Sequence, residues 1–203
     1  MAKVQTTCIK CGSGLESRLF CFSCKTIQPF TESNLSYFEV FGLSKEFEID
    51  ETDLEVKYQN LSFELHPDFF ESAAESEKNL SEKASAILNT AYKTLSEPSS
   101  RALYLLNLFS LRVKLDERSL PEGFLGEMFF LQEKLDELLE YENESELSIL
   151  KNDLIRRQKK IEAKFTLLFR KIEKYPNDSE NLQELQTNLN AEKYLYRLLE
   201  RIN

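Results

Sequence analysis

Apolar residues recur every three or four positions along most of this chain, which is the spacing of one face of an α-helix. Two such series stand close together: Leu54, Tyr58, Leu61 and Leu65, then Leu80, Ala84, Leu88, Ala91 and Leu95. Pro67 ends the first series, because proline lacks an N–H and pushes the preceding residue out of the helical region. The pattern predicts two amphipathic helices joined as a hairpin.

Three longer helical patterns follow, at 124–141, 145–175 and 179–202, with short polar breaks between them. Short connections make neighbouring helices antiparallel, so these patterns predict a three-helix bundle. The middle pattern has near-heptad spacing, and its expected core residues are Leu147, Leu150, Leu154, Ile161, Phe165, Leu168 and Ile172. No strand-like alternation runs for any length, and the predicted fold class is all-α.

The helix at 124–141 carries more apolar residues than its core face needs. At about 100° per residue, one face holds Phe124, Met128, Leu131, Leu135, Leu138 and Leu139. Phe129 and Phe130 lie on either side of this face, and Glu133, Glu137 and Glu140 share the outer surface with them. Exposed phenylalanines are unfavourable unless another surface covers them. We expect a protein partner there; the alternative is that the hairpin domain packs on these rings.

Composition and charge narrow the function classes. Hydrophobic residues make up 41% of the 203 residues and charged residues 30%, which is a normal globular balance. The formal net charge of -9 argues against a general nucleic-acid binder, whose binding face is basic. No apolar run reaches the length of a bilayer, and no signal-peptide core is present. We expect a soluble intracellular protein with no nucleic-acid or membrane partner.

The four cysteines form two C-x-x-C pairs, Cys8 with Cys11 and Cys21 with Cys24, nine residues apart. Each pair can form a tight knuckle that presents two thiolates to one ion, which suits a tetrahedral zinc site. Disulfides would need an oxidising compartment, and a redox C-x-x-C is usually single. Iron in the same geometry is the open alternative. We predict that residues 1–30 form a segment that structural zinc holds folded, with no open coordination position for catalysis.

His66 is the only histidine of the chain, and it stands in the sequence Leu65-His66-Pro67-Asp68. One interpretation is an ordinary helix end, where His66 meets the negative end of the helix dipole. The surrounding motifs favour another. YFEVFGL at 37–43 precedes the hairpin and AYKTL at 91–95 closes it. This arrangement resembles the J domain of the DnaJ-type co-chaperones, over residues 36–109.

A more specific resemblance covers nearly the whole chain. FLGEMFFLQEKL at 124–135 looks like the client-binding helix of the HscB-type co-chaperones of iron–sulfur cluster assembly, in which a J domain precedes a three-helix bundle. The match includes HPDFF at 66–70, SEKA at 81–84, NTAYKTL at 89–95 and SRALYLL at 100–106. The cysteine pairs resemble the zinc extension of some members. The implied domains are a zinc-binding segment at 1–30, a J domain at 36–109 and a client-binding bundle at 116–203.

The resemblance also implies partners and site residues. A DnaK/HscA-class ATPase would bind His66, Pro67 and Asp68, with Lys57 on the preceding helix, and would be stimulated to hydrolyse ATP. An IscU-type iron–sulfur scaffold protein would bind a patch that consists of Leu125, Gly126, Phe129, Phe130, Glu133, Glu137 and Tyr194. Together these interactions would promote cluster transfer. Lys57 stands among four acidic residues, so its attraction to an acidic face of the chaperone should be weak. This favours a J-protein with a specialised role over one with general DnaJ-like activity.

No nucleophile can be assigned beside His66, so we expect a binding protein and not an enzyme. Two alternatives remain: a J-protein that serves a different client, and an adaptor that acts through its zinc ribbon. Too few residues precede Cys8 for a transit peptide, which favours a bacterial cytoplasm over a mitochondrial matrix, unless the chain has been trimmed.

Overall fold

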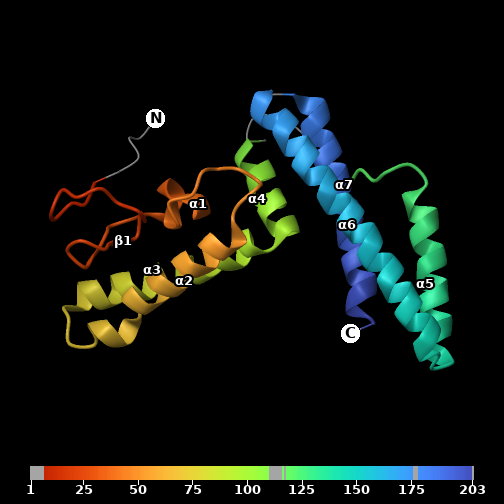
Figure 1. Ribbon diagram of the computed structural model, residues 1–203, viewed down its shortest axis with the longest axis horizontal. Helices are drawn as coiled ribbons and strands as arrows, with labels where there is room; N and C mark the ends of the chain where they lie inside the picture. Colours follow the sequence, from red (N-terminus) through yellow and green to blue (C-terminus); the bar gives the residue numbers. More distant parts are fainter. Residues whose placement is uncertain (1–6, 110–115, 117, 176–177, 203) are drawn as a thin grey trace. The chain divides into compact units, whose positions relative to one another are not determined.

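The computed structural model describes residues 7–109, 116, 118–175 and 178–202, and these are mostly helical (Figure 1). Among them are seven α-helices, two short 3-10 helices and one two-stranded sheet. The chain divides into two compact units, Met1–Glu97 and Pro98–Asn203. The all-α prediction is confirmed. No helix in the described part of the chain combines the length and apolar character needed to cross a membrane.

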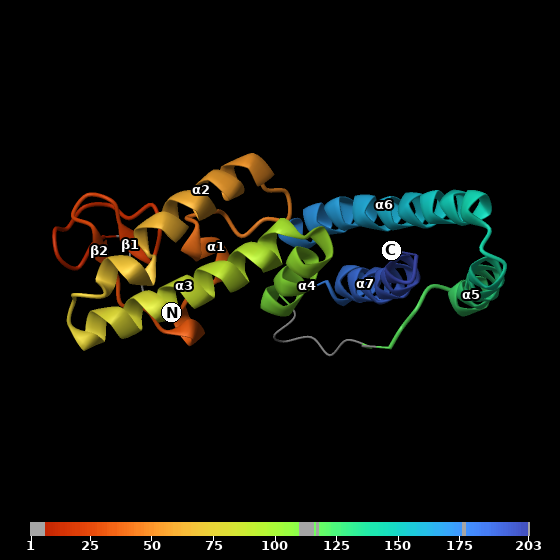
Figure 2. The same cartoon turned by 90° about the horizontal axis from the view of Figure 1, so that it is seen from below.

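The first unit is built around a helical hairpin. It contains η1 (Glu32–Asn34), α1 (Tyr37–Val40), α2 (Glu51–Glu64), η2 (Pro67–Phe70) and α3 (Glu75–Ser96). Helices α2 and α3 run antiparallel, side by side (Figures 1 and 2). Asp50 caps α2, because its Oδ1 accepts hydrogen bonds from the N–H groups of Thr52 and Asp53 at 2.9 and 3.0 Å. Of the predicted hairpin core, Leu54, Leu61, Leu65, Ala84, Leu88, Ala91 and Leu95 are buried, whereas Tyr58 and Leu80 are only partly buried.

The cysteine segment is tied to this hairpin. Its strands β1 (Phe20–Cys21) and β2 (Thr26–Ile27) pair antiparallel, and Leu19, Phe20 and Ile27 are buried. The hydroxyl of Ser17 donates to the carbonyl of Val40 at 2.6 Å. The N–H of Arg18 donates to the carbonyl of Glu39 at 3.1 Å. The segment is therefore fixed to the C-terminal end of α1 by one side-chain and one backbone hydrogen bond.

Gly42 follows α1 in a left-handed backbone conformation that favours glycine. Its φ is +64°, and a Cβ atom there would lie 1.9 Å from the carbonyl oxygen of Glu16. Gly42→Ala should destabilise the first unit by more than about 2 kcal/mol, because the strained backbone and the clash add. Chemical denaturation followed by circular dichroism measures the effect. The control is Gly126→Ala, in the first turn of the helix Phe124–Glu140 with open space around it, which should be neutral or slightly stabilising. Equal stabilities of the Gly42→Ala variant and the parent would contradict the close approach.

The second unit contains α4 (Pro98–Phe109), α5 (Phe124–Glu140), α6 (Glu144–Lys174) and α7 (Ser179–Glu200). Helices α5, α6 and α7 form the predicted antiparallel bundle, and each begins and ends within two residues of its expected range. Figures 1 and 2 both show α6 and α7 side by side along most of their length. Helix α4 packs on α7 and α6 and so belongs to this unit by its contacts.

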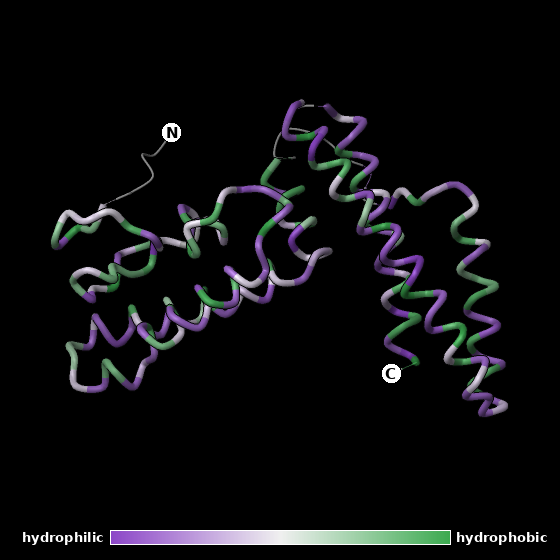
Figure 3. Tube along the Cα trace, viewed as in Figure 1, coloured by the Kyte–Doolittle hydropathy of each residue, from purple (hydrophilic) through white to green (hydrophobic). Residues whose placement is uncertain are grey.

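The bundle core follows the predicted helical faces. Hydrophobic and hydrophilic positions alternate along each helix in Figure 3, as expected where one face is buried. The buried core residues around α5 are Phe124, Met128, Leu135, Leu138, Leu150, Leu154, Ala191, Leu195, Leu198 and Leu199. Leu139, which we expected in the core, is exposed, because it lies at the edge of the α5 face.

Candidate functional sites

The four cysteine sulfurs converge as the spacing predicts. All four Sγ atoms lie within 4.8 Å of one another, with Cys8 and Cys24 3.5 Å apart and Cys11 and Cys21 3.7 Å apart. A tetrahedral zinc ion with Zn–S bonds of about 2.3 Å requires sulfurs about 3.8 Å apart, whereas a disulfide requires about 2.05 Å. All four cysteines are free thiols. The donor set and its spacing fit one tetrahedral metal ion.

The surroundings of these sulfurs favour the thiolate at Cys8 and the thiol at Cys24. Burial raises the pKa of Cys8, but the N–H groups of Cys11 and Lys10 outweigh it and lower this pKa to about 6. The hydroxyl of Thr26 lowers the pKa of Cys24, but burial and the three neighbouring thiols outweigh it and raise this pKa to about 11. Four thiolates so close together repel one another, and a cation at their centre removes that conflict.

Gln28 supports the same cluster and was missed by the sequence analysis. Its side chain is fully buried, its Nε2 lies 3.4 Å from Cys8 Sγ, and its Oε1 accepts from the N–H of Ile9 at 3.1 Å. Gln28 thus orients the first cysteine knuckle from a position just after β2. No local sequence signal marks it, because the contact depends on the strand pair folding back.

The His66-Pro67-Asp68 loop is held at its base and free at its tip. The carbonyl of Leu65, where α2 ends, accepts hydrogen bonds from the hydroxyls of Ser81 and Ser85 on α3, both at 2.8 Å. The N–H of Asp68 donates to Nδ1 of His66 at 3.3 Å, and Asp68 Oδ2 lies 3.4 Å from the same nitrogen. The Asp68 side chain is 75% exposed. A carboxylate is therefore displayed on a loop whose backbone is anchored.

Two phenylalanines flank this loop and were also missed. Phe63 and Phe69 are 66% and 60% exposed, and their ring centroids lie 5.1 Å apart. With Tyr58, His66 and Asp68 they line an open pocket of about 480 Å³. The sequence does carry a signal, because Phe63 lies outside the core series of α2. An apolar surface thus adjoins the exposed carboxylate.

Lys57 does not join that pocket. Its Nζ lies 2.6 Å from Asp53 Oδ2, one helical turn away on α2. Glu64, in the last turn of α2, pairs with Lys25 of the cysteine segment. The positive charge of Lys57 is therefore already paired within α2.

The predicted scaffold patch lies on the surface of the bundle. Phe129 and Phe130 are 61% and 71% exposed, and Leu125, Gly126, Glu133 and Glu137 are exposed beside them on α5. Tyr194 on α7 is exposed at its edge and meets the ring of Phe124 edge-on, with centroids 5.9 Å apart. The bundle core is complete without these side chains.

Known proteins share both the J-domain hairpin and the three-helix bundle of this chain. A family model for the DnaJ domain matches residues 36–104, and one for the HSCB C-terminal oligomerisation domain matches residues 120–203. The human iron–sulfur cluster co-chaperone protein HscB is 32% identical over 179 residues, which cover 88% of this chain and 72% of the human protein. This chain belongs to the HscB family.

Other HscB proteins agree. The mouse protein is 35% identical over 63% of this chain and 56% of its own length, and the Arabidopsis thaliana homolog is 36% identical over 64% of this chain and 51% of its own length. The crystal structure of human HscB superposes with a TM-score of 0.76 at 30% identity, covering 97% of this chain and 96% of that chain. HscB from Vibrio cholerae gives a TM-score of 0.68 at 28% identity, covering 83% of this chain and 95% of that chain. The resemblance to HscB-type co-chaperones is confirmed. The chain is a co-chaperone of iron–sulfur cluster assembly that carries a J domain.

Proposed function

We propose that this HscB-family chain holds an IscU-type iron–sulfur scaffold protein on its bundle and stimulates a DnaK/HscA-class ATPase through its His66-Pro67-Asp68 loop. The outcome would be cluster transfer from the scaffold. The observation that carries the proposal is the pair of exposed rings Phe129 and Phe130, beside Glu133 and Glu137, on a bundle that does not need them for its core. Such a surface is unfavourable in water and favourable under a partner.

The loop would act by binding, with no bond broken by this chain. The carboxylate of Asp68 can accept a bidentate pair of hydrogen bonds from an arginine of the chaperone. Pro67 limits the conformational entropy that the loop loses on binding, and the bond from Asp68 N–H orients His66. Because Asp53 already pairs with Lys57, the rings of Phe63 and Phe69 are the larger remaining contact surface.

The cysteine cluster would have a structural role. Cys8, Cys11, Cys21 and Cys24 would hold one zinc ion, and the ion would supply folding energy for a segment with few buried apolar residues. All four ligand positions come from the chain, so the ion offers no site for a substrate. HscB proteins occur in a bacterium and in eukaryotes, and the bacterial cytoplasm stays our prediction for this chain.

Calorimetric titration with an IscU-type scaffold protein tests the proposal. The variant Phe129→Ala with Phe130→Ala should bind at least 100-fold more weakly, because central aromatic contacts each contribute about 2 kcal/mol or more. The control is Leu167→Ala, which removes an exposed apolar side chain of α6 outside the patch and should bind normally. The melting temperature should stay unchanged in both.

Two results would contradict this assignment. A large fall in melting temperature for the double variant would show that the rings belong to the core. A failure of the parent protein to bind the scaffold would leave a J-protein with another client.

A further inference from the structure

A pocket of about 340 Å³ opens between α5, α6 and α7, within the bundle. Its floor is apolar and consists of Phe124, Met128, Ile161, Ala191 and Leu195. Its rim is charged and carries Glu127, Asp153, Arg156, Arg157, Lys160 and Lys164. An apolar floor with a few converging charges is the usual composition of a binding pocket.

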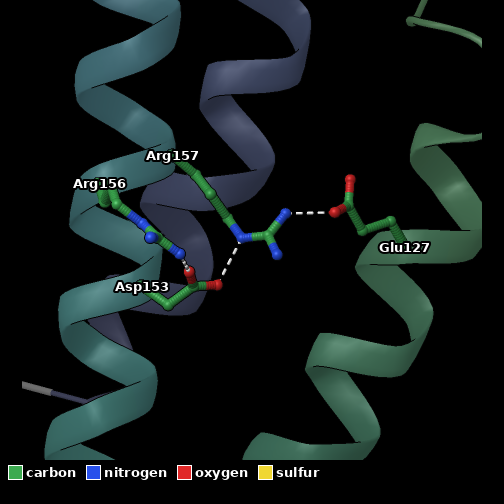
Figure 4. Close-up of polar contacts among 4 residues, drawn as sticks. All are labelled: Glu127, Asp153, Arg156 and Arg157. Atoms are coloured by element: carbon green, nitrogen blue, oxygen red, sulfur yellow. Dashed lines mark hydrogen bonds and ion pairs between the residues drawn. The ribbon is translucent and has the colours of Figure 1, made fainter.

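The rim charges do not cancel. Figure 4 shows Arg157 between two carboxylates: it pairs with Glu127 of α5 and lies 2.6 Å from Asp153, which also pairs with Arg156. Hydrogen bonds from Arg157 and then Arg156 lower the pKa of Asp153, so this carboxylate stays ionised. Glu127 and Asp153 are thus already engaged by the two arginines.

Lys160 and Lys164 remain on the rim. Lys164 Nζ lies 3.4 Å from the Oδ1 atom of Asn188, and no carboxylate among the described residues pairs with either lysine. A local excess of positive charge therefore borders an apolar floor, in a chain whose formal net charge is -9. An occupant that complements this pocket combines a carboxylate with an apolar side chain.

The pocket borders the scaffold patch. Phe124 belongs to its floor, meets Tyr194 of the patch edge-on, and directly precedes Leu125 of the patch. A stable protein interface takes about 20–30 residues on each side. The seven patch residues can be only part of such an interface, so a partner bound there must cover neighbouring surface as well.

We propose that the pocket receives an acidic segment of the same scaffold protein, with an apolar side chain on the floor and a carboxylate at Lys160 and Lys164. This inference rests on the proposed scaffold binding. Glu133 and Glu137 on the patch attract basic groups, whereas the pocket rim attracts acidic ones. Charges of opposite sign at the two places would orient the partner on the bundle and reject a reversed arrangement.

The variant Lys160→Glu with Lys164→Glu tests the pocket in the full chain. Both lysines are exposed, so folding should be unaffected. Scaffold affinity should fall about tenfold or more, and the loss should shrink as salt is raised. The matched control is Lys171→Glu with Lys174→Glu, which makes the same charge change on the same helix outside the pocket and should bind like the parent.

Each outcome separates the pocket from the patch. Suppose that the parent binds the scaffold and the Phe129→Ala with Phe130→Ala variant does not. If the Lys160→Glu with Lys164→Glu variant then binds normally, the pocket inference is wrong and the scaffold-binding proposal stands. Equal losses in the two lysine variants would indicate a general charge effect and would also overturn it. No binding by the parent would overturn the scaffold proposal itself.

Discussion

The Asp68→Asn variant is expected to bind the scaffold normally and to leave the chaperone's ATPase at its basal rate. Asparagine keeps the size of the side chain but loses its charge and one acceptor oxygen, so a partner arginine is left with an incomplete pair. Breaking such a pair at an interface costs about 2–5 kcal/mol, which corresponds to roughly 30-fold or more in affinity. Single-turnover ATP hydrolysis by the chaperone, with and without the variant, measures the effect.

The Asp68→Asn substitution should leave the folded structure and its stability unchanged. Asp68 is mostly exposed, and its N–H bond to His66 comes from the backbone, which asparagine retains. Circular dichroism should therefore match the parent. Asp136→Asn makes the same chemical change at an exposed ion pair of α5 and should stimulate fully. If Asp68→Asn stimulated as strongly as this control, the loop would have no role in the chaperone contact.

The second large effect concerns the metal. Replacing Cys8 and Cys11 by serine should abolish metal binding and unfold the cysteine segment, because two of the four sulfur donors are lost together. Structural zinc contributes about 10–16 kcal/mol in isolated zinc-finger peptides, far more than the small apolar core of this segment can replace. Elemental analysis of the purified protein gives the metal content, and limited proteolysis reports the unfolding.

A nearby change that spares the ligands provides the comparison. Ser23→Ala lies between Cys21 and Cys24 and should retain one metal ion per chain and resist protease like the parent. A full complement of metal in the double cysteine variant would mean that other groups bind it. The element found in the parent also decides between zinc and iron.

Features that depend on local spacing could be predicted from the sequence. The apolar periodicity and the polar breaks placed the boundaries of α5, α6 and α7 well, because helical faces and breaks act over a few residues. The convergence of the four sulfurs followed from ligand type and spacing alone. The pairing of Lys57 with Asp53, four residues apart, was within reach of the same reasoning.

Features that depend on contacts between distant segments could not be predicted from the sequence. Gln28 reaches Cys8 only because β2 folds back on β1, and the basic rim at Lys160 exists only because α5 begins beside the middle of α6. The contacts of α4 with α6 and α7 have the same origin, since its residues match a J-domain motif while its packing belongs to the bundle. Periodicity identifies a buried face but does not name the element that covers it.

Ser17 and Arg18 bond to the end of α1, so a metal ion bound in the cysteine cluster would stabilise the J-domain unit together with its own segment. A ligand that binds only the folded state stabilises it by about 1.4 kcal/mol for each tenfold rise in its free concentration above the Kd. The free zinc concentration in the cell would then set how much of this co-chaperone is folded. Metal limitation would lower its working abundance without any change in its synthesis.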